Sequence, residues 1–148
     1  MRKTIVTLGA TLVLTFGTFT PTSHIAEAAT SCYDSYKFNE TFSSVQATDY
    51  WALCKGNLKV KGTISGSEYY EPQGNQAVVT VQVYREQWGL DEFVDEFDVV
   101  LYDDEPGDFS YTVGKTDLVN YYLKFKVKEY EGNGGKWTFK AKGTISTN

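Results

Sequence analysis

The clearest structural pattern in the chain is VNYYLKFKVKEY (residues 119–130), EGNGG (131–135) and KWTFKAKGTI (136–145). In both longer segments apolar and polar side chains alternate, which is typical of a β-strand with one buried and one solvated face. The glycines and asparagine between the segments tolerate positive φ, so the stretch predicts two strands joined as a hairpin.

The same alternation recurs through the rest of the chain, in residues 36–42, 57–65, 76–85, 97–102 and 109–113. Residues 87–97 also fit helical spacing, and residues 44–53 are compatible with a short helix. No long amphipathic helix is predicted. This pattern predicts an all-β fold, an antiparallel β-sandwich or partly open barrel of about six to eight strands.

The amino terminus has the layout of an export signal. Met1, Arg2 and Lys3 form a basic start, residues 4–20 form an apolar run, and Ala26-Glu27-Ala28 supplies a small-x-small cleavage site. We expect a secretory signal peptide over residues 1–28 and a single domain over residues 29–148. The apolar run is short for a membrane span, so we expect a secreted protein, extracellular or associated with the cell wall, with no span after cleavage.

The sequence contains two cysteines, Cys32 and Cys54. In an oxidising compartment they predict one disulfide, since only one pairing exists and two thiols without a histidine make a poor zinc site. The only histidine, His24, precedes the expected cut. Histidine-dependent and thiol catalysis are therefore excluded from the mature chain. A two-carboxylate glycosidase needs a cleft that a single small sandwich hardly provides, so we expect no enzyme.

Charge is segregated along the mature chain. Removing Arg2, Lys3 and Glu27 from 14 basic and 19 acidic residues leaves 12 against 18, a net charge of −6, which argues against a nucleic-acid partner. Most cations lie on the predicted wet faces of three strands: Lys59, Lys61, Lys124, Lys126, Lys128, Lys136, Lys140 and Lys142. They indicate an anion-binding surface, or alternatively a solvated sheet face balanced by carboxylates such as Glu96 and Asp98.

One short sequence occurs twice. KVKGTIS (residues 59–65) resembles KAKGTIS (residues 140–146). Seven residues are too few to indicate a repeat architecture, and convergence of two lysine- and threonine-rich strands on one solvent-facing pattern explains the likeness.

The acidic residues are concentrated between Glu86 and Asp108, which holds ten of the 18 mature carboxylates. Asp103, Asp104 and Asp108 surround the Pro106-Gly107 turn and offer hard oxygen ligands for calcium, although their spacing is not that of the twelve-residue calcium loop. An ordinary charged turn is the alternative, and no other cofactor is expected. The whole acidic region could also dock on a basic partner protein.

Aromatic residues near predicted loops provide a third type of candidate site. Trp51, Trp88, Tyr69, Tyr70 and Tyr84 could form a platform for pyranose rings, or could simply cap the ends of the sandwich. The sequence therefore predicts a secreted, noncatalytic module that binds an extracellular or cell-envelope polymer such as a polysaccharide or teichoic acid. The alternative is a secreted inhibitor or protein-interaction module that uses the acidic region 86–108. The oligomeric state is left open.

Overall fold

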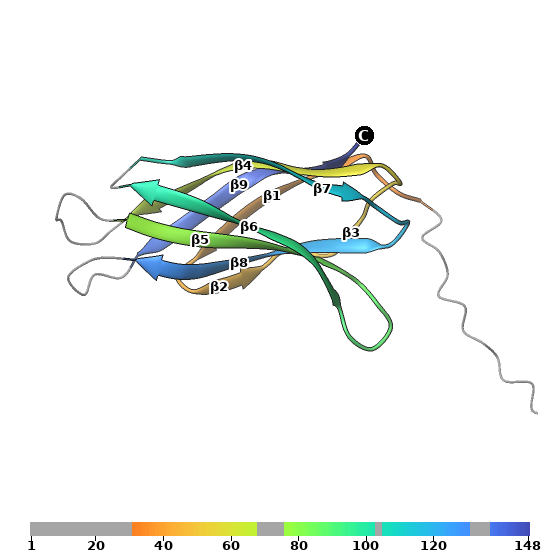
Figure 1. Cartoon of the computed structure of the whole chain (residues 1–148), viewed down its shortest axis with the longest axis horizontal. Helices are drawn as coiled ribbons and strands as arrows, with labels where there is room; N and C mark the ends of the chain where they lie inside the picture. Colours follow the sequence, from red (N-terminus) through yellow and green to blue (C-terminus); the bar gives the residue numbers. More distant parts are fainter. Residues whose placement is uncertain (1–30, 68–75, 103–104, 131–136) are drawn as a thin grey trace, which may run out of the picture.

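The computed structural model describes residues 31–67, 76–102, 105–130 and 137–148, which form β-strands joined by short connections (Figure 1). The strands are β1 (Ser35–Phe42), β2 (Val45–Ala47), β3 (Trp51–Ala52), β4 (Asn57–Ser67), β5 (Gln76–Arg85), β6 (Glu92–Tyr102), β7 (Gly107–Lys115), β8 (Asn120–Tyr130) and β9 (Thr138–Thr147). No helix able to cross a membrane occurs among these residues. The expected signal peptide over 1–28 lies outside them.

The strands form two antiparallel sheets that pack face to face (Figure 1). The first sheet has the order β1-β9-β4-β7, and the second has the order β2-β8-β5-β6, with β3 also pairing with β8. The predicted antiparallel β-sandwich is thus confirmed.

The core lies between the sheets and follows the alternation in the sequence. Inward side chains of β4 and β9, such as Val60, Ile64 and Ile145, are fully buried, as are Val81 of β5 and Phe125 of β8. Aromatic rings join the layers: the ring of Phe42 stacks on those of Phe125 and Phe139, with centroids 5.5 Å apart in each pair. Burial of this continuous apolar face is the main force that holds the two sheets together.

The predicted hairpin over residues 119–145 is wrong, although both of its strands exist. β8 pairs with β2, β3 and β5 in the second sheet, whereas β9 pairs with β1 and β4 in the first, so the chain crosses the sandwich between them. The connection over 131–136 lies outside the described residues. Alternation shows which side of a strand is buried but not which strand lies beside it, so a cross-sheet connection has the same sequence pattern as a hairpin.

Two other ambiguous segments are extended. Residues 44–53 contain the short strands β2 and β3 in place of a helix, because each pairs with β8. Residues 92–102 form the single strand β6, which makes a hairpin with β5 and has a register shift beside Val83 and Tyr84. Backbone pairing with a neighbouring strand overrides the weak local preference for helix in both segments.

A seam of aromatic side chains joins the edge strands β6 and β7 on one side of the sandwich. The ring of Phe97 packs on those of Tyr111 and Phe109, with centroid distances of 4.5 and 5.5 Å. The Tyr111 hydroxyl donates to an Asp95 carboxylate oxygen over 3.0 Å. These contacts cover the core where no backbone pairing links the two sheets.

The predicted disulfide joins Cys32 to Cys54. Beside it, Tyr33 and Leu53 form a parallel bridge, and the Tyr33 amide donates to the Ala52 carbonyl over 2.9 Å. The disulfide therefore fixes the start of the described chain to the segment that leads from β3 into β4.

Candidate functional site

Five lysines cover the outer face of the first sheet, and we call them the lysine surface: Lys37, Lys59, Lys61, Lys140 and Lys142. Each of these side chains alternates with an inward residue of its strand; Val60 and Ala141, for example, are fully buried. The strand geometry therefore directs the ammonium groups to solvent. Lys37 was not among the lysines expected to bind, although its place between inward Tyr36 and Phe38 was a signal that could have identified it.

The register of the first sheet keeps these lysines apart. Lys61 faces Thr144 on β9 and Ser110 on β7, and Lys140 faces Ser65 on β4. No lysine of the lysine surface stands directly opposite another, so the strongest cross-strand repulsion is avoided. The surface is a lattice of ammonium groups separated by hydroxyl groups.

This lattice results from the repeated seven-residue sequence. Residues 59–65 and 140–146 pair with each other in antiparallel register about Gly62 and Gly143. Because the direction is reversed, the lysines of each copy fall opposite the threonine or serine of the other. The likeness of the two segments therefore has a structural consequence that the sequence did not reveal.

A shallow hollow of about 660 Å³ lies at the centre of the lysine surface, between Lys61 and Lys142. Its other outward side chains are Thr63, Asp108, Ser110 and Thr144. The Thr63 hydroxyl donates to an Asp108 carboxylate oxygen over 2.6 Å. The hollow thus offers two ammonium groups for an anion and several hydroxyl groups, together with one carboxylate that accepts hydrogen bonds from a polyol.

The ion pairs of the described part of the chain lie elsewhere. Arg85 contacts Glu92 at 2.6 Å and Asp117 at 3.2 Å, and Lys128 contacts Asp98 at 3.1 Å. All of these basic groups belong to the second sheet. Among the described residues, none of these ion pairs involves the lysine surface, although the carboxylate of Asp108 also lines its hollow.

The remaining predicted lysines lie on the opposite face of the molecule. Lys124, Lys126 and Lys128 project from β8 on the outer face of the second sheet, and Lys136 lies outside the described residues. Across β5, the edge strand β6 presents Glu96 and Asp98. The expected lysines therefore do not form one surface: the sandwich divides them between its two outer faces.

The lysines of the second sheet have acidic neighbours. The Asp98 carboxylate accepts hydrogen bonds from the Thr80 hydroxyl over 2.7 Å and from the Lys128 ammonium over 3.1 Å. The hydrogen bond from Thr80, followed by that from Lys128, holds the pKa of Asp98 below its ordinary value. This face fits the alternative of a solvated sheet with favourable cross-strand pairs.

The described residues of the predicted aromatic platform do not lie together on one surface. Trp51 is 8% exposed and packs against Tyr36 and Phe38 in the core, so it presents no ring to a ligand. This corrects its assignment as a binding residue: β3 turns the indole inward when it pairs with β8. Tyr69 and Tyr70 lie outside the described residues.

An aromatic cluster that includes Tyr84 occupies the outer face of the second sheet. The rings of Tyr84 and Tyr122 stack at 5.1 Å, and Tyr50 packs on Tyr122 at 4.9 Å. Burial, and then the negative charge of Asp91, raises the pKa of Tyr122 to about 12. The stacked rings of Tyr84 and Tyr122 cover one face of each other, whereas Tyr50 is tilted and 51% exposed.

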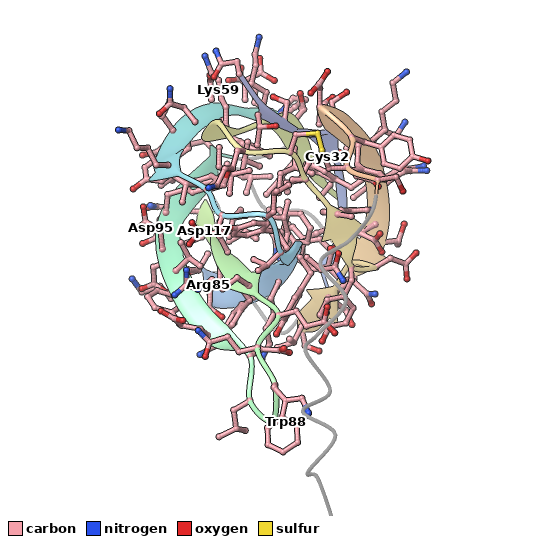
Figure 2. All side chains as sticks on the ribbon, turned by 90° about the vertical axis from the view of Figure 1, so that its right-hand side faces the viewer. Cys32, Lys59, Arg85, Trp88, Asp95 and Asp117 are labelled. Atoms are coloured by element: carbon pink, nitrogen blue, oxygen red, sulfur yellow. A yellow bond between two sulfur atoms is a disulfide. The ribbon has the colours of Figure 1, made fainter. Side chains whose placement is uncertain are left out.

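Trp88 differs from the other two tryptophans. It is fully exposed at the tip of the β5–β6 hairpin, where Gly89 has φ of 99°, and Leu90 beside it is 86% exposed. Figure 2 shows this hairpin projecting from the body of the sandwich. The position of Trp88 beside Gly89, between two predicted strands, indicated partial exposure, and the indole is in fact fully exposed.

The predicted calcium ligands are only partly described. Asp108 accepts the hydrogen bond from Thr63, whereas Asp103 and Asp104 lie outside the described residues. Within the described ranges, no group of three histidine, cysteine, aspartate or glutamate side chains is close enough to hold a metal ion.

The comparisons with known proteins assign no family. No family model and no curated protein matches the chain. Two structures of infectious bursal disease virus, of the Gt and Gx strains, share 13% and 14% identity with TM-scores of 0.37 and 0.29. They match 77% and 76% of this chain but only 30% and 29% of the viral chains, and similarity this low supports no conclusion about function.

Proposed function

We propose that this protein is a secreted, noncatalytic module whose lysine surface binds an anionic extracellular or cell-envelope polymer, such as an acidic polysaccharide or a teichoic acid. The observation that carries the proposal is the placement of five lysines on one sheet face, without ion pairs among the described residues, in a chain of net negative charge. The alternative is that these lysines form a solvated sheet face that resists aggregation.

The chemistry of the hollow favours a polymer that carries both anionic groups and hydroxyls. Lys61 and Lys142 attract phosphate or carboxylate groups, and Asp108 accepts hydrogen bonds from sugar or polyol hydroxyls. Lysine binds anions as a point charge, without the bidentate geometry of arginine. Recognition is therefore loose and rests on many weak contacts along the polymer, each weakened by salt.

Export is supported by sequence features and by the disulfide. Residues 1–28 have the composition of a signal peptide, and the bond between Cys32 and Cys54 fits an oxidising compartment. The module would thus meet cell-envelope polymers after secretion.

Binding to teichoic acid tests the proposal. The wild-type protein should bind purified poly(glycerol phosphate) teichoic acid at low salt and bind neutral dextran of similar size far more weakly. The double variant Lys61→Gln/Lys142→Gln should bind teichoic acid roughly tenfold more weakly and show a flatter dependence on salt.

The matched control is Lys124→Gln/Lys126→Gln, which removes the same charge from the opposite face. We expect it to bind nearly as well as the wild type. If both double variants lose affinity equally, net charge and not the lysine surface determines binding. If neither loses affinity, the proposal is wrong.

A further inference from the structure

The tip of the β5–β6 hairpin carries large apolar side chains that are exposed to solvent in the monomer. Trp88 is 100% exposed, whereas Trp51 and Trp137 are 8% and 3% exposed. A solvated indole and the adjacent Leu90 retain a large hydrophobic free energy that a contact could use. One exposed apolar residue is ordinary, but a fully exposed tryptophan on a projecting hairpin is the feature expected of a docking group.

Carboxylates lie at the base of this hairpin. Glu86, Asp91 and Glu92 flank the tip in sequence, and Asp117 lies beside Arg85 at 3.2 Å. With Arg85 as the one cation of the group, the local charge is four negative against one positive. The partner of such a hairpin should therefore present positively charged side chains around a site that accommodates an indole ring.

The hollow of the lysine surface has these properties. Lys61 and Lys142 of the hollow can place their ammonium groups over the two faces of the indole. The methylene groups of these lysines can cover the apolar edges of the ring. The outlying lysines Lys59 and Lys140 can meet the carboxylates of the hairpin. Asp108 is an acceptor for the indole N–H.

We propose that the hairpin of one copy of this chain docks on the lysine surface of a second copy, with Trp88 seated between Lys61 and Lys142. Figure 2 shows Trp88 and Lys59 on opposite sides of the sandwich, so the hairpin points away from the lysine surface of its own chain. The contact therefore joins two different surfaces of two copies, and repeated in one direction it builds a ring or an open chain of copies.

The proposal does not rest on polymer binding, because its test contains no polymer. Sedimentation velocity of the wild type at low ionic strength should reveal concentration-dependent association that disappears at high salt. The Trp88→Ala variant lacks the indole that docks. The Lys61→Glu/Lys142→Glu variant lacks the two lysines proposed to contact that indole. The association constant of each variant alone should be about tenfold or more below that of the wild type. Each variant should therefore stay monomeric over the concentration range in which the wild type associates.

Mixing the two variants decides the geometry. The Lys61→Glu/Lys142→Glu chain keeps an intact hairpin and the Trp88→Ala chain keeps an intact lysine surface, so an equimolar mixture should form a one-to-one dimer that does not grow further. An interface in which the same residues of both copies meet, such as Trp88 on Trp88, would not be restored by mixing. Lys124→Glu/Lys126→Glu, with the same charge change on the other face, should still self-associate.

Three results would overturn the proposal: a wild type that remains monomeric at low salt and high concentration, association retained by Trp88→Ala, or a mixture of the two defective variants that stays monomeric. Circular dichroism of each variant establishes that the altered chains are folded, as expected for exposed side chains.

Discussion

Gly62 and Gly143 face each other across β4 and β9, at the centre of the two similar seven-residue segments. A Cβ added to Gly62 would lie 2.7 Å from Cζ of Phe109, and one added to Gly143 would lie 2.8 Å from Cα of Gly62. Both glycines leave room for aromatic rings of neighbouring strands. The close approach of β4 and β9 that forms the lysine lattice therefore requires glycine at both positions.

This relationship predicts the effect of adding one methyl group. Gly143→Ala should lower the free energy of unfolding by about 1–3 kcal/mol, because the new Cβ meets backbone atoms that cannot move aside easily. Urea denaturation measures the change. Thr144→Ala, at the adjacent outward position, should stay within about 0.5 kcal/mol of the wild type. If Gly143→Ala and the wild type had the same free energy of unfolding, β4 and β9 would be able to move apart without loss of stability, and the prediction would be wrong.

The disulfide predicts a second effect on stability. Replacing both cysteines, Cys32→Ser/Cys54→Ser, should lower the free energy of unfolding by about 3 kcal/mol, since the open chain has more conformations to lose on folding. Reduction of the wild type should reproduce most of this loss, while the double variant should not respond to reductant. A reductant effect on the double variant would contradict this prediction.

Asp98 predicts a loss of stability in acid. Its pKa is lowered in the folded protein, so the unfolded chain takes up the proton first, near pH 3.9. The carboxylate therefore stabilises the fold above that pH, and the contribution disappears as the pH falls through the lower folded pKa. The effect should not exceed about 1 kcal/mol, because the side chain is 40% exposed.

The measurement is urea denaturation at pH 6 and pH 3. Asp98→Asn should show a smaller difference between the two pH values than the wild type. Glu105→Gln, which removes an exposed carboxylate at the β6–β7 turn, is the control for general loss of charge. A larger difference in Asp98→Asn would mean that the sign is reversed.

Tyr122 predicts a change at alkaline pH. Its pKa of about 12 exceeds the ordinary value of 10, so the phenol ionises more readily in the unfolded chain. Tyr122 should therefore cost stability as the pH rises from 10 to 12. Titration of tyrosine absorbance should lose its highest step in Tyr122→Phe, and that variant should lose less stability between pH 8 and pH 11. Tyr102→Phe, at a 60% exposed position, should keep the highest step.

The candidate surfaces could be predicted from the sequence only one side chain at a time. Alternation placed Lys61 and Lys124 on solvated faces, and both are outward. Alternation did not show that these two lysines lie on different sheets. Outward side chains have the same sequence pattern whether their strands are neighbours in one sheet or belong to opposite sheets. The burial of Trp51 and the full exposure of Trp88 likewise follow from β3 pairing with β8 and from a projecting hairpin, which residue type does not specify.

The long alternating strands, their buried sides and the single disulfide could be predicted from the sequence, because they follow from the two-residue period of a strand and from the count of cysteines. The short strands β2 and β3, and the choice of neighbours for every strand, became clear only from the folded chain. The tertiary structure placed β8 and β9 in opposite sheets, paired the two seven-residue segments about Gly62 and Gly143, and divided the lysines between two faces. The physical reason is that strand pairing joins residues far apart in the chain, and it is selected by how the whole core packs rather than by any local pattern.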